Sequence, residues 1–295
     1  MYSCNHVLYR LLCDKKIIDP ANIEIYAARV RDREDLPVLR CKTSGVIFLS
    51  EIDHTKDDHY IEKNVESGKI EVEDGEVPLR QVNDDLHRQK AFKKHIEGKR
   101  WLDFGCGAAS LLELMEPDCE YAYGVELNEL HRASAAKRNI DVCENLEDLP
   151  VQQFDIITLF HVFEHLDRPL EILEQLKILL SPGGMILLEV PHAKDILLET
   201  FECDPFKRFT LWSEHLVLHT QESLKAILSD IGFKSVVTSG HQRYPLSNHL
   251  YWLGNGKPGG HEEWSFLNSA ELDNAYTNML MQNDQTDTLV AIVTL

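Results

Sequence analysis

The stretch that decides the fold is RWLDFGCGAAS, residues 100–110, which is followed by a lone acidic residue, Glu126, in YAYGVEL. An apolar strand runs into the pattern Asp103-x-Gly105-x-Gly107, and a second carboxylate follows about twenty residues later; this is typical of a nucleotide pocket at the carboxyl edge of a parallel sheet. Because glycine has no side chain, it tolerates the sharp strand-to-helix turn and lets a ligand approach the backbone. Glu126 offers two acceptor oxygens to the two hydroxyls of a ribose. The spacing therefore predicts a site for an adenosine-containing ligand.

A dinucleotide-binding dehydrogenase is the main alternative for a glycine loop of this kind. That class of protein needs the spacing G-x-G-x-x-G. Here Gly105 and Gly107 are followed by Ala108, Ala109 and Ser110, so the third glycine is missing. The loop therefore favours a different adenosine cofactor.

The chain resembles the class I S-adenosylmethionine-dependent methyltransferases at Asp103, Gly105, Gly107 and Glu126, and in HVFEHL at residues 161–166. The resemblance implies an enzyme that takes a methyl group from S-adenosylmethionine. It also implies an α/β fold with a Rossmann-like, seven-stranded sheet whose last strand is antiparallel. The cofactor-binding residues that it implies are Asp103, Gly105, Cys106, Gly107, Glu126, Leu127, Asn145, Leu146, Phe160 and His161.

The composition is that of an ordinary globular chain of 295 residues, with 43% hydrophobic and 27% charged residues. The formal net charge is -19, from 49 acidic against 30 basic residues, and would repel a phosphate backbone, so we expect no nucleic-acid partner. No apolar run is long enough to cross a membrane, and no secretory leader is visible. Seven cysteines without paired spacing fit a reducing compartment. We therefore expect a cytoplasmic protein that acts on a small molecule.

The chain divides into a predicted N-terminal extension or cap, residues 1–82, and a methyltransferase domain, residues 83–295. Alternating strands and helices in the second part indicate a parallel sheet with right-handed crossovers. An insertion at 240–288 is glycine-rich and aromatic, and is predicted to form a lid or binding loop near the substrate mouth. The predicted helices are 84–96, 109–116, 128–138, 168–180, 221–231 and 265–282, with strands at 101–104, 121–126, 140–143, 154–160, 185–190, 233–239 and 288–295. A helical segment after Pro191, a turn at 181–184 and a loop at 204–220 complete the prediction.

The extension carries short β-like runs, VLRC from Val38 and GVIFLS from Gly45. Some sugar methyltransferases begin with a zinc module that contains Cys-x-x-Cys-Gly, and CKTSG from Cys41 resembles a remnant of it. Ser44 stands where the second cysteine should be, and the chain has no other Cys-x-x-Cys. A four-thiolate zinc site is therefore not available, and we predict no structural zinc.

Methyl transfer to a hydroxyl needs an acceptor held in line with the methyl group and a side chain that takes the proton, most often histidine. His161, Glu164 and His165 follow the strand that ends at Phe160, so they are predicted at the carboxyl edge where ligands bind. By resemblance, His161 lines the cofactor, while Glu164 and His165 face the acceptor or brace the following helix. His192, just after the next strand, shares that edge.

A second candidate segment is LWSEHLVLHTQESL, residues 211–224. It resembles a segment of deoxysugar methyltransferases in which a Glu-His pair supplies the catalytic histidine, so Glu214 is the implied orienter and His215 the implied base. An adjacent carboxylate raises the pKa of an imidazole, which would make His215 a better base near neutral pH. Leu218 and His219 depart from the aromatic pair often found there. The implied acceptor is a hydroxyl of a sugar, as in a surface-polysaccharide precursor.

Two other functions stay open: methylation of a quinone or lipid-like ring, and binding of S-adenosylmethionine without catalysis. An apolar acceptor should enlarge an apolar lining in the insertion, whereas His241, Arg243, Asn248 and His249 there are hydrogen-bonding residues, which favours a polar acceptor.

A metal ion held by Glu164, His165 and His192 is a further alternative. No ligand spacing supports such a site, so the sequence predicts no metal. The methylated atom and the oligomeric state stay open.

Overall fold

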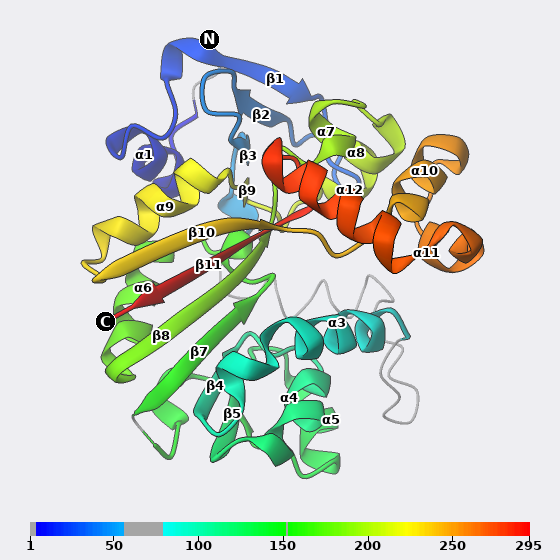
Figure 1. The fold of residues 1–295 in the computed structure, drawn as a ribbon. Coiled ribbons are helices and arrows are strands. Elements are labelled where there is room, and N and C mark those ends of the chain that lie inside the picture. The colour runs from blue at the N-terminus through cyan, green and yellow to red at the C-terminus, as the bar shows by residue number, and fades with distance from the viewer. Residues whose placement is uncertain (1–3, 56–78, 152) are drawn as a thin grey trace.

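The computed structural model describes residues 4–55, 79–151 and 153–295. Its centre is a seven-stranded sheet in the order β10-β11-β8-β7-β4-β5-β6 (Figure 1). The strands are β4 (Arg100–Phe104), β5 (Tyr121–Val125), β6 (Val142–Cys143), β7 (Phe154–Phe160), β8 (Leu180–Pro191), β10 (Ser235–His241) and β11 (Thr288–Thr294). The strands from β8 to β6 pair in parallel, and β11 runs antiparallel to both of its neighbours. The predicted Rossmann-like sheet with an antiparallel last strand is confirmed.

Helices cover both faces of this sheet because the strands are apolar on both sides. Adjacent residues of a strand point to opposite faces. Thus Ile156 packs with Ile96 and Ala135 on one face, while Ile157 packs with Leu173 on the other. The first face is covered by α3 (Leu79–Ile96), α4 (Ser110–Met115) and α5 (Glu129–Lys137), and the second by α6 (Pro169–Ile178) and α9 (Gln221–Asp230).

A second sheet joins three strands from the N-terminal part of the chain to one short strand near residue 217. It contains four antiparallel strands, β1 (Ile23–Ala27), β2 (Val38–Cys41), β3 (Ile47–Leu49) and β9 (Val217–Leu218), and α1 (Val7–Asp14) lies nearby. The β-like runs expected near Val38 and Gly45 are thus confirmed. Figure 1 shows the blue N-terminal strands at the opposite end of the molecule from α4 and α5. Leu8 and Leu12 share one apolar cluster with Leu188 of the large sheet. The boundary at residue 82 stays a prediction.

The insertion between β10 and β11 contains three α-helices, α10 (Leu246–Asn255), α11 (Gly260–Glu263) and α12 (Ala270–Gln282), and a short 3₁₀ helix, Ser265–Leu267. The helix expected at 265–282 is confirmed by α12, but α10 was not expected. Trp252 of α10 is buried against Phe206, and a Cβ on Gly260 would lie 2.3 Å from the Cβ of Tyr251. Glycine is therefore required here for close packing of α10 against α11, which composition alone does not reveal. A lid role for the insertion stays a prediction.

Two local predictions are wrong. Residues 181–184 belong to β8, where the register shift between Phe154 and Ile156 leaves them as a bulge without register partners on β7. The expected loop at 204–220 begins with α8 (Asp204–Thr210), whose first turn holds a proline. The helical segment after Pro191 is α7 (Ile196–Glu199). Within the described ranges, no helix combines the length and the apolar character needed to span a membrane.

Candidate active site

The glycine loop leaves β4 at the carboxyl edge of the sheet and turns into α4. Gly105 and Gly107 have φ angles of +76° and +56°, a region that favours glycine. The backbone N–H groups of Gly105 and Cys106 donate to the carbonyl of Val125, at 2.7 and 3.1 Å, so the loop is fixed against the end of β5. A Cβ on Gly105 would lie 2.4 Å from Cγ2 of Val162. The segment after β7 therefore lies directly against the loop.

Cys106 is a small buried residue within this loop. Burial raises the pKa of its thiol well above the usual value. A Cβ on Gly124 of β5 would lie 2.5 Å from its sulfur, so the thiol fills the space between loop and strand. Cys106 thus supports the loop from below as a neutral group.

Glu126 closes the glycine loop from the end of β5. Its Oε2 accepts from the backbone N–H of Gly107 and its Oε1 from that of Asn128, both at 2.8 Å. A carboxylate has about four lone-pair positions, so each oxygen can accept one further donor. Glu126 is half-buried and its neighbour Leu127 is exposed. A partly exposed carboxylate with spare acceptor positions, next to two glycines, fits the ribose of an adenosine cofactor.

Asp103 lies within β4 rather than on the open edge. Its side chain is 3% exposed, and the hydroxyl of Thr158 donates to it at 2.7 Å. Burial raises the pKa of Asp103 to about 7. On α3, Asp85 accepts a hydrogen bond from Ser110, the first residue of α4, so this helix closes over the glycine loop from the other side. Asp103 and Asp85 thus form a buried acidic layer beneath the loop.

The other predicted cofactor residues lie at the ends of β6 and β7. Asn145 is exposed and Leu146 half-buried; Asp148 accepts from the backbone N–H and the side-chain amide of Asn145, both at 3.3 Å. Phe160 is buried and stacks on Phe92 with ring centroids 5.5 Å apart. The structure therefore brings the predicted cofactor residues to adjacent strand ends, and their contact with the cofactor stays a prediction.

A buried chain of charges links α3, β8 and the segment after β7. Arg88 of α3 donates through Nε and Nη2 to Oε1 of Glu189, at 3.0 and 2.9 Å. His161 stands between two carboxylates, with Nε2 3.3 Å from Oε1 of Glu189 and Nδ1 3.1 Å from Oε1 of Glu164. Burial alone would raise the pKa of Glu189, but Arg88 and His161 hold it well below its usual value.

Arg88 and Glu189 were not predicted from the sequence. Glu189 is the one acid in the apolar run MILLEVP, and its side chain is 0% exposed. A lone carboxylate inside an apolar strand is costly to bury without a partner, so this position was a usable signal. Arg88 gives no such signal, because basic residues are common on the surface of helices.

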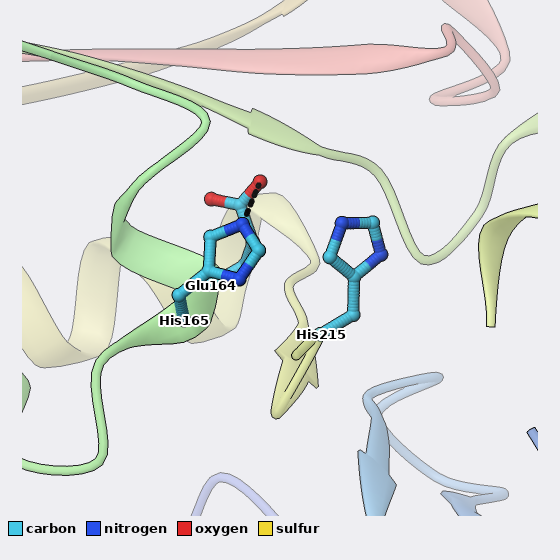
Figure 2. A group of neighbouring side chains, drawn as sticks. All are labelled: Glu164, His165 and His215. Atoms are coloured by element: carbon cyan, nitrogen blue, oxygen red, sulfur yellow. Dashed lines mark ion pairs between the residues drawn. The ribbon is translucent and has the colours of Figure 1, made fainter. Parts of the chain in front are cut away.

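The Glu164 cluster, which we define as Glu164, His165 and His215, adjoins this chain of charges through the contact of His161 with Glu164. Figure 2 shows the three side chains of the cluster. Glu164 and His165 belong to the short 3₁₀ turn Phe163–His165 after β7, and His215 faces them from the loop before β9. One ligand atom from each residue lies within 4.8 Å of the other two. The structure therefore brings together two of the predicted catalytic histidines, His165 and His215.

Hydrogen bonds to backbone carbonyls orient both histidines of the cluster. Nδ1 of His165 lies 2.7 Å from the carbonyl oxygen of Glu214, and Nδ1 of His215 lies 2.8 Å from that of Thr210. A carbonyl oxygen only accepts, so Nδ1 is the donor in each ring. In a neutral ring the lone pair then lies on Nε2. Glu214 thus orients His165 through its backbone.

The predicted rise in the pKa of His215 is wrong. Burial and the nearby His165 ring lower the pKa of His215 to about 3, so its imidazole is neutral at physiological pH. Burial alone would raise the pKa of Glu164, but the hydrogen bond from His161 and the neighbouring histidines lower it to about 2. The carboxylate whose charge acts on His215 is that of Glu164, which is close in space and fifty-one positions away in sequence.

The N-terminal segment fixes the loop that carries His215. Asp32 accepts from the backbone N–H of Ser213 at 2.9 Å and from its hydroxyl at 2.6 Å. Leu49 of β3 donates its backbone N–H to the carbonyl of Leu216 at 3.1 Å. The position of His215 therefore depends on residues about 160 to 180 positions earlier in the chain.

His192 lies apart from the Glu164 cluster. It is 1% exposed, its Nδ1 donates to the carbonyl of Thr286 at 3.0 Å, and its Nε2 lies 3.7 Å from Asp284. Burial lowers the pKa of His192, and the nearby charges that act on it are Asp284, Lys194 and Glu222. The structure therefore does not bring His192 to the other three predicted catalytic residues.

Cys41 begins the predicted remnant of the zinc module, and its sulfur contacts a hydroxyl and a backbone N–H group. Its sulfur lies 3.1 Å from the hydroxyl of Thr43 and accepts from the backbone N–H of Asp19 at 3.4 Å. Burial alone would raise its pKa, but hydrogen bonds from Ser44 and Thr43 lower the pKa of Cys41 to about 7. The absence of zinc stays a prediction.

Comparison with known proteins places this site in context. A family model described as a methyltransferase domain matches residues 78–238. The chain is 28% identical to a ubiquinone biosynthesis O-methyltransferase of Psychrobacter arcticus, over 72% of this chain and 82% of that protein. It is 27% identical to a tRNA U34 carboxymethyltransferase of Idiomarina loihiensis over 50% of this chain, and spans about half of that relative's length, 49%.

Among solved structures, a SAM-dependent methyltransferase from Archaeoglobus fulgidus aligns with a TM-score of 0.47 and 20% identity. The alignment covers 72% of this chain and 94% of that one.

Proposed function

The chain belongs to the methyltransferase domain family, with S-adenosylmethionine as methyl donor, and we propose that it methylates a hydroxyl group of a small polar acceptor. The observation that carries this proposal is the position of the Glu164 cluster. Val162 packs against Gly105 of the cofactor loop, and the cluster begins two residues later. In this proposal the cluster is the polar site that faces the acceptor, next to the cofactor pocket.

The proposed chemistry needs little from the protein beyond placement and proton removal. S-adenosylmethionine supplies a methyl carbon bonded to a positively charged sulfur, which leaves with the electrons of the broken bond. The chain must hold the acceptor oxygen in line with that carbon and take up the hydroxyl proton as the new bond forms. In this proposal Nε2 of His215 takes the proton, while His165 and Glu164 orient the acceptor. The lowered pKa keeps the His215 ring neutral, so its lone pair is available, and also makes it a weaker base than the sequence predicted.

The first candidate acceptor is a sugar hydroxyl, as in a surface-glycan precursor. The resemblance of residues 211–224 to deoxysugar methyltransferases supports it. The polar residues of the insertion add no support, because His249 and Asn248 are buried and bonded within the protein. Nδ1 of His249 lies 2.7 Å from the hydroxyl of Tyr276, and the side-chain oxygen of Asn248 accepts from Gly259 at 3.3 Å.

The second candidate acceptor is a phenolic hydroxyl on a quinone-like ring. The helices of the insertion expose several large apolar side chains, which suit an apolar acceptor: Leu250, Leu253, Phe266, Leu272, Met279 and Met281. The relative from Psychrobacter arcticus is described as a ubiquinone biosynthesis O-methyltransferase, which supports the same candidate.

Calorimetry and a transfer assay test the proposal in two stages. S-adenosylmethionine and NAD are titrated separately into the protein, with Glu126→Ala as the control variant. We expect saturable binding of S-adenosylmethionine that Glu126→Ala weakens about 100-fold, because two hydrogen bonds to a charged group are lost. Heat with NAD alone would overturn the cofactor assignment.

Methyl transfer is then measured with nucleotide sugars, a dihydroxyphenol and tRNA as acceptors. We expect transfer to one hydroxyl class and a drop of about 100-fold or more in His215→Gln, with binding of S-adenosylmethionine unchanged. Transfer to tRNA, or transfer that His215→Gln leaves intact, would contradict the proposal. Binding without any transfer would leave a cofactor-binding protein.

A further inference from the structure

The Glu164 cluster has an unusual buried oxygen. The Glu164 side chain is 0% exposed, and in the part of the chain that the structure describes no donor reaches its Oε2. A buried ionised oxygen without a partner is costly, because the charge has lost its water. The other carboxylate oxygen, Oε1, lies 3.8 Å from Nε2 of His165, and His215 completes the cluster. A buried carboxylate beside two histidine rings is a donor set suited to a cation.

The hydrogen bonds around the cluster support the same conclusion. Both Nδ1 atoms donate to backbone carbonyls, those of Glu214 and Thr210, which fixes the tautomer in which Nε2 carries the lone pair of a neutral ring. Histidines that bind a metal usually donate their other ring N–H to a carbonyl or carboxylate, which holds the ring in place. His165 and His215 thus have the surroundings expected of metal ligands.

We propose that Glu164, His165 and His215 bind a divalent transition-metal cation of the zinc or manganese type. Two histidines and one carboxylate form a common ligand set for such ions, and three protein ligands leave positions for further oxygens. The ligand atoms lie within 4.8 Å of one another. Ligand atoms around zinc are about 3.3–3.6 Å apart for bonds of about 2.1 Å, so a shift of about 1 Å closes the site.

The chain of charges behind the cluster keeps the carboxylate in place. His161 holds Oε1 of Glu164 at 3.1 Å, and Glu189 and Arg88 stand behind His161. The same oxygen, Oε1, lies 3.8 Å from Nε2 of His165, so His161 fixes the carboxylate beside the histidines of the cluster. Residues that orient a ligand in this way typically influence metal affinity.

The position of the site indicates what the cation does. A cation on Nε2 of His215 would replace that nitrogen as the group that removes the acceptor proton: it would lower the pKa of a coordinated hydroxyl and fix its oxygen, and the proton would pass to solvent. This role rests on the proposed function, whereas the binding of the cation does not. The sequence predicted no metal because no ligand spacing was visible: His215 is fifty residues from His165. His192, the third ligand in the sequence-based alternative, lies near Asp284 and not in the cluster.

Titration of the cation alone tests the site without any acceptor, so the result is independent of the transfer assay. The full chain is freed of metal with a chelator, and Zn²⁺, Mn²⁺ and Co²⁺ are titrated by calorimetry, with Co²⁺ also followed by visible absorption. We expect one equivalent to bind, and binding to weaken at least about 100-fold in Glu164→Gln and His215→Gln. His192→Gln is the matched control, since it removes a buried histidine with the same kind of Nδ1 bond. It should bind the cation like the unmodified protein.

A measurement on the unmodified protein covers the case in which Glu164→Gln fails to fold. Pulsed electron paramagnetic resonance of the Mn²⁺-loaded chain detects coupling to histidine nitrogen. We expect this coupling together with saturable binding. The absence of saturable binding for all three cations, binding that neither cluster variant weakens, or a bound Mn²⁺ without nitrogen coupling would each overturn the proposal.

Discussion

The glycine loop and the Glu164 cluster lie at the same edge of one sheet, yet the chain builds them in different ways. The loop is local: Gly105, Gly107 and Glu126 lie within twenty-two residues. The backbone N–H of Gly107 donates to the Glu126 carboxylate, and that of Gly105 to the carbonyl of Val125. The cluster is assembled from the turn after β7 and the loop before β9, and N-terminal residues hold that loop in place. A local site can be recognised from spacing, whereas an assembled site depends on partners that spacing does not reveal.

The first prediction concerns the chain of charges behind the cluster, where we expect the largest loss of stability. In Glu189→Gln, Arg88 keeps its buried charge but loses the nearer of its two anionic partners, Asp85 being 3.6 Å away, and His161 loses one of its two carboxylates. We expect the free energy of unfolding to fall by about 3–5 kcal/mol, the usual cost of breaking a buried ion pair. Chemical denaturation measures this loss.

A half-exposed ion pair provides the control for Glu189→Gln. Glu199 pairs with Arg40, and their side chains are 35% and 19% exposed. Because water screens such a pair, Glu199→Gln should cost about 1 kcal/mol at most. Equal losses in the two variants would show that the assembled site carries no special dependence on its charges.

The second prediction concerns pH and the buried acid of the local site. The pKa of Asp103 is raised from 3.8 to about 7, so the folded protein holds a proton there that the unfolded chain releases near pH 4. Stability from this group is therefore full below about pH 4, falls as pH rises towards 7, and is constant above it. Relative to Asp103→Asn, the unmodified protein should lose roughly 2–4 kcal/mol across this window.

Denaturation curves of both proteins at a series of pH values test this prediction. The asparagine can still accept the hydrogen bond from Thr158, so the comparison isolates the charge. A difference in stability that does not change between pH 4 and 7, or that changes in favour of the unmodified protein, would contradict the raised pKa. The expected pH dependence would also show that burial in the fold sets the protonation state of Asp103, although a local motif predicts the residue itself.

The sequence predicted the features that depend on local residues, but not those that depend on burial or on contacts between distant segments. The sheet was predicted because strand length and apolar character follow from local residues, as in β7 at 154–160, where the predicted and observed bounds agree. Residues 181–184 were misread because a Pro-Gly-Gly run resembles a turn, whereas here it forms a bulge within β8 at the register shift against β7. The pairing of Glu164 with His215 and the lowered pKa of His215 depend on burial and on contacts between distant segments. Neither quantity is encoded in spacing.

The third prediction concerns the contact between the glycine loop and the segment after β7. Gly105→Ala puts a side chain on a backbone with φ of +76° and brings its Cβ within 2.4 Å of Val162. We expect a loss of about 1–3 kcal/mol in the free energy of unfolding, from strain and contact together, and weaker binding of S-adenosylmethionine. Gly98→Ala is the matched control, since φ there is +69° and no described atom lies within 4 Å of the added Cβ.

The double variant Gly105→Ala with Val162→Ala separates the two causes of this loss. If the contact with the segment after β7 matters, removing the two methyl groups of Val162 should restore part of the stability and of the cofactor affinity, and leave a loss close to that of Gly98→Ala. Because Val162 precedes the Glu164 cluster by two residues, the coupling between positions 105 and 162 measures how tightly the local site is joined to the assembled one. Additive losses, without any recovery, would mean that the two sites share an edge of the sheet but not a structural connection.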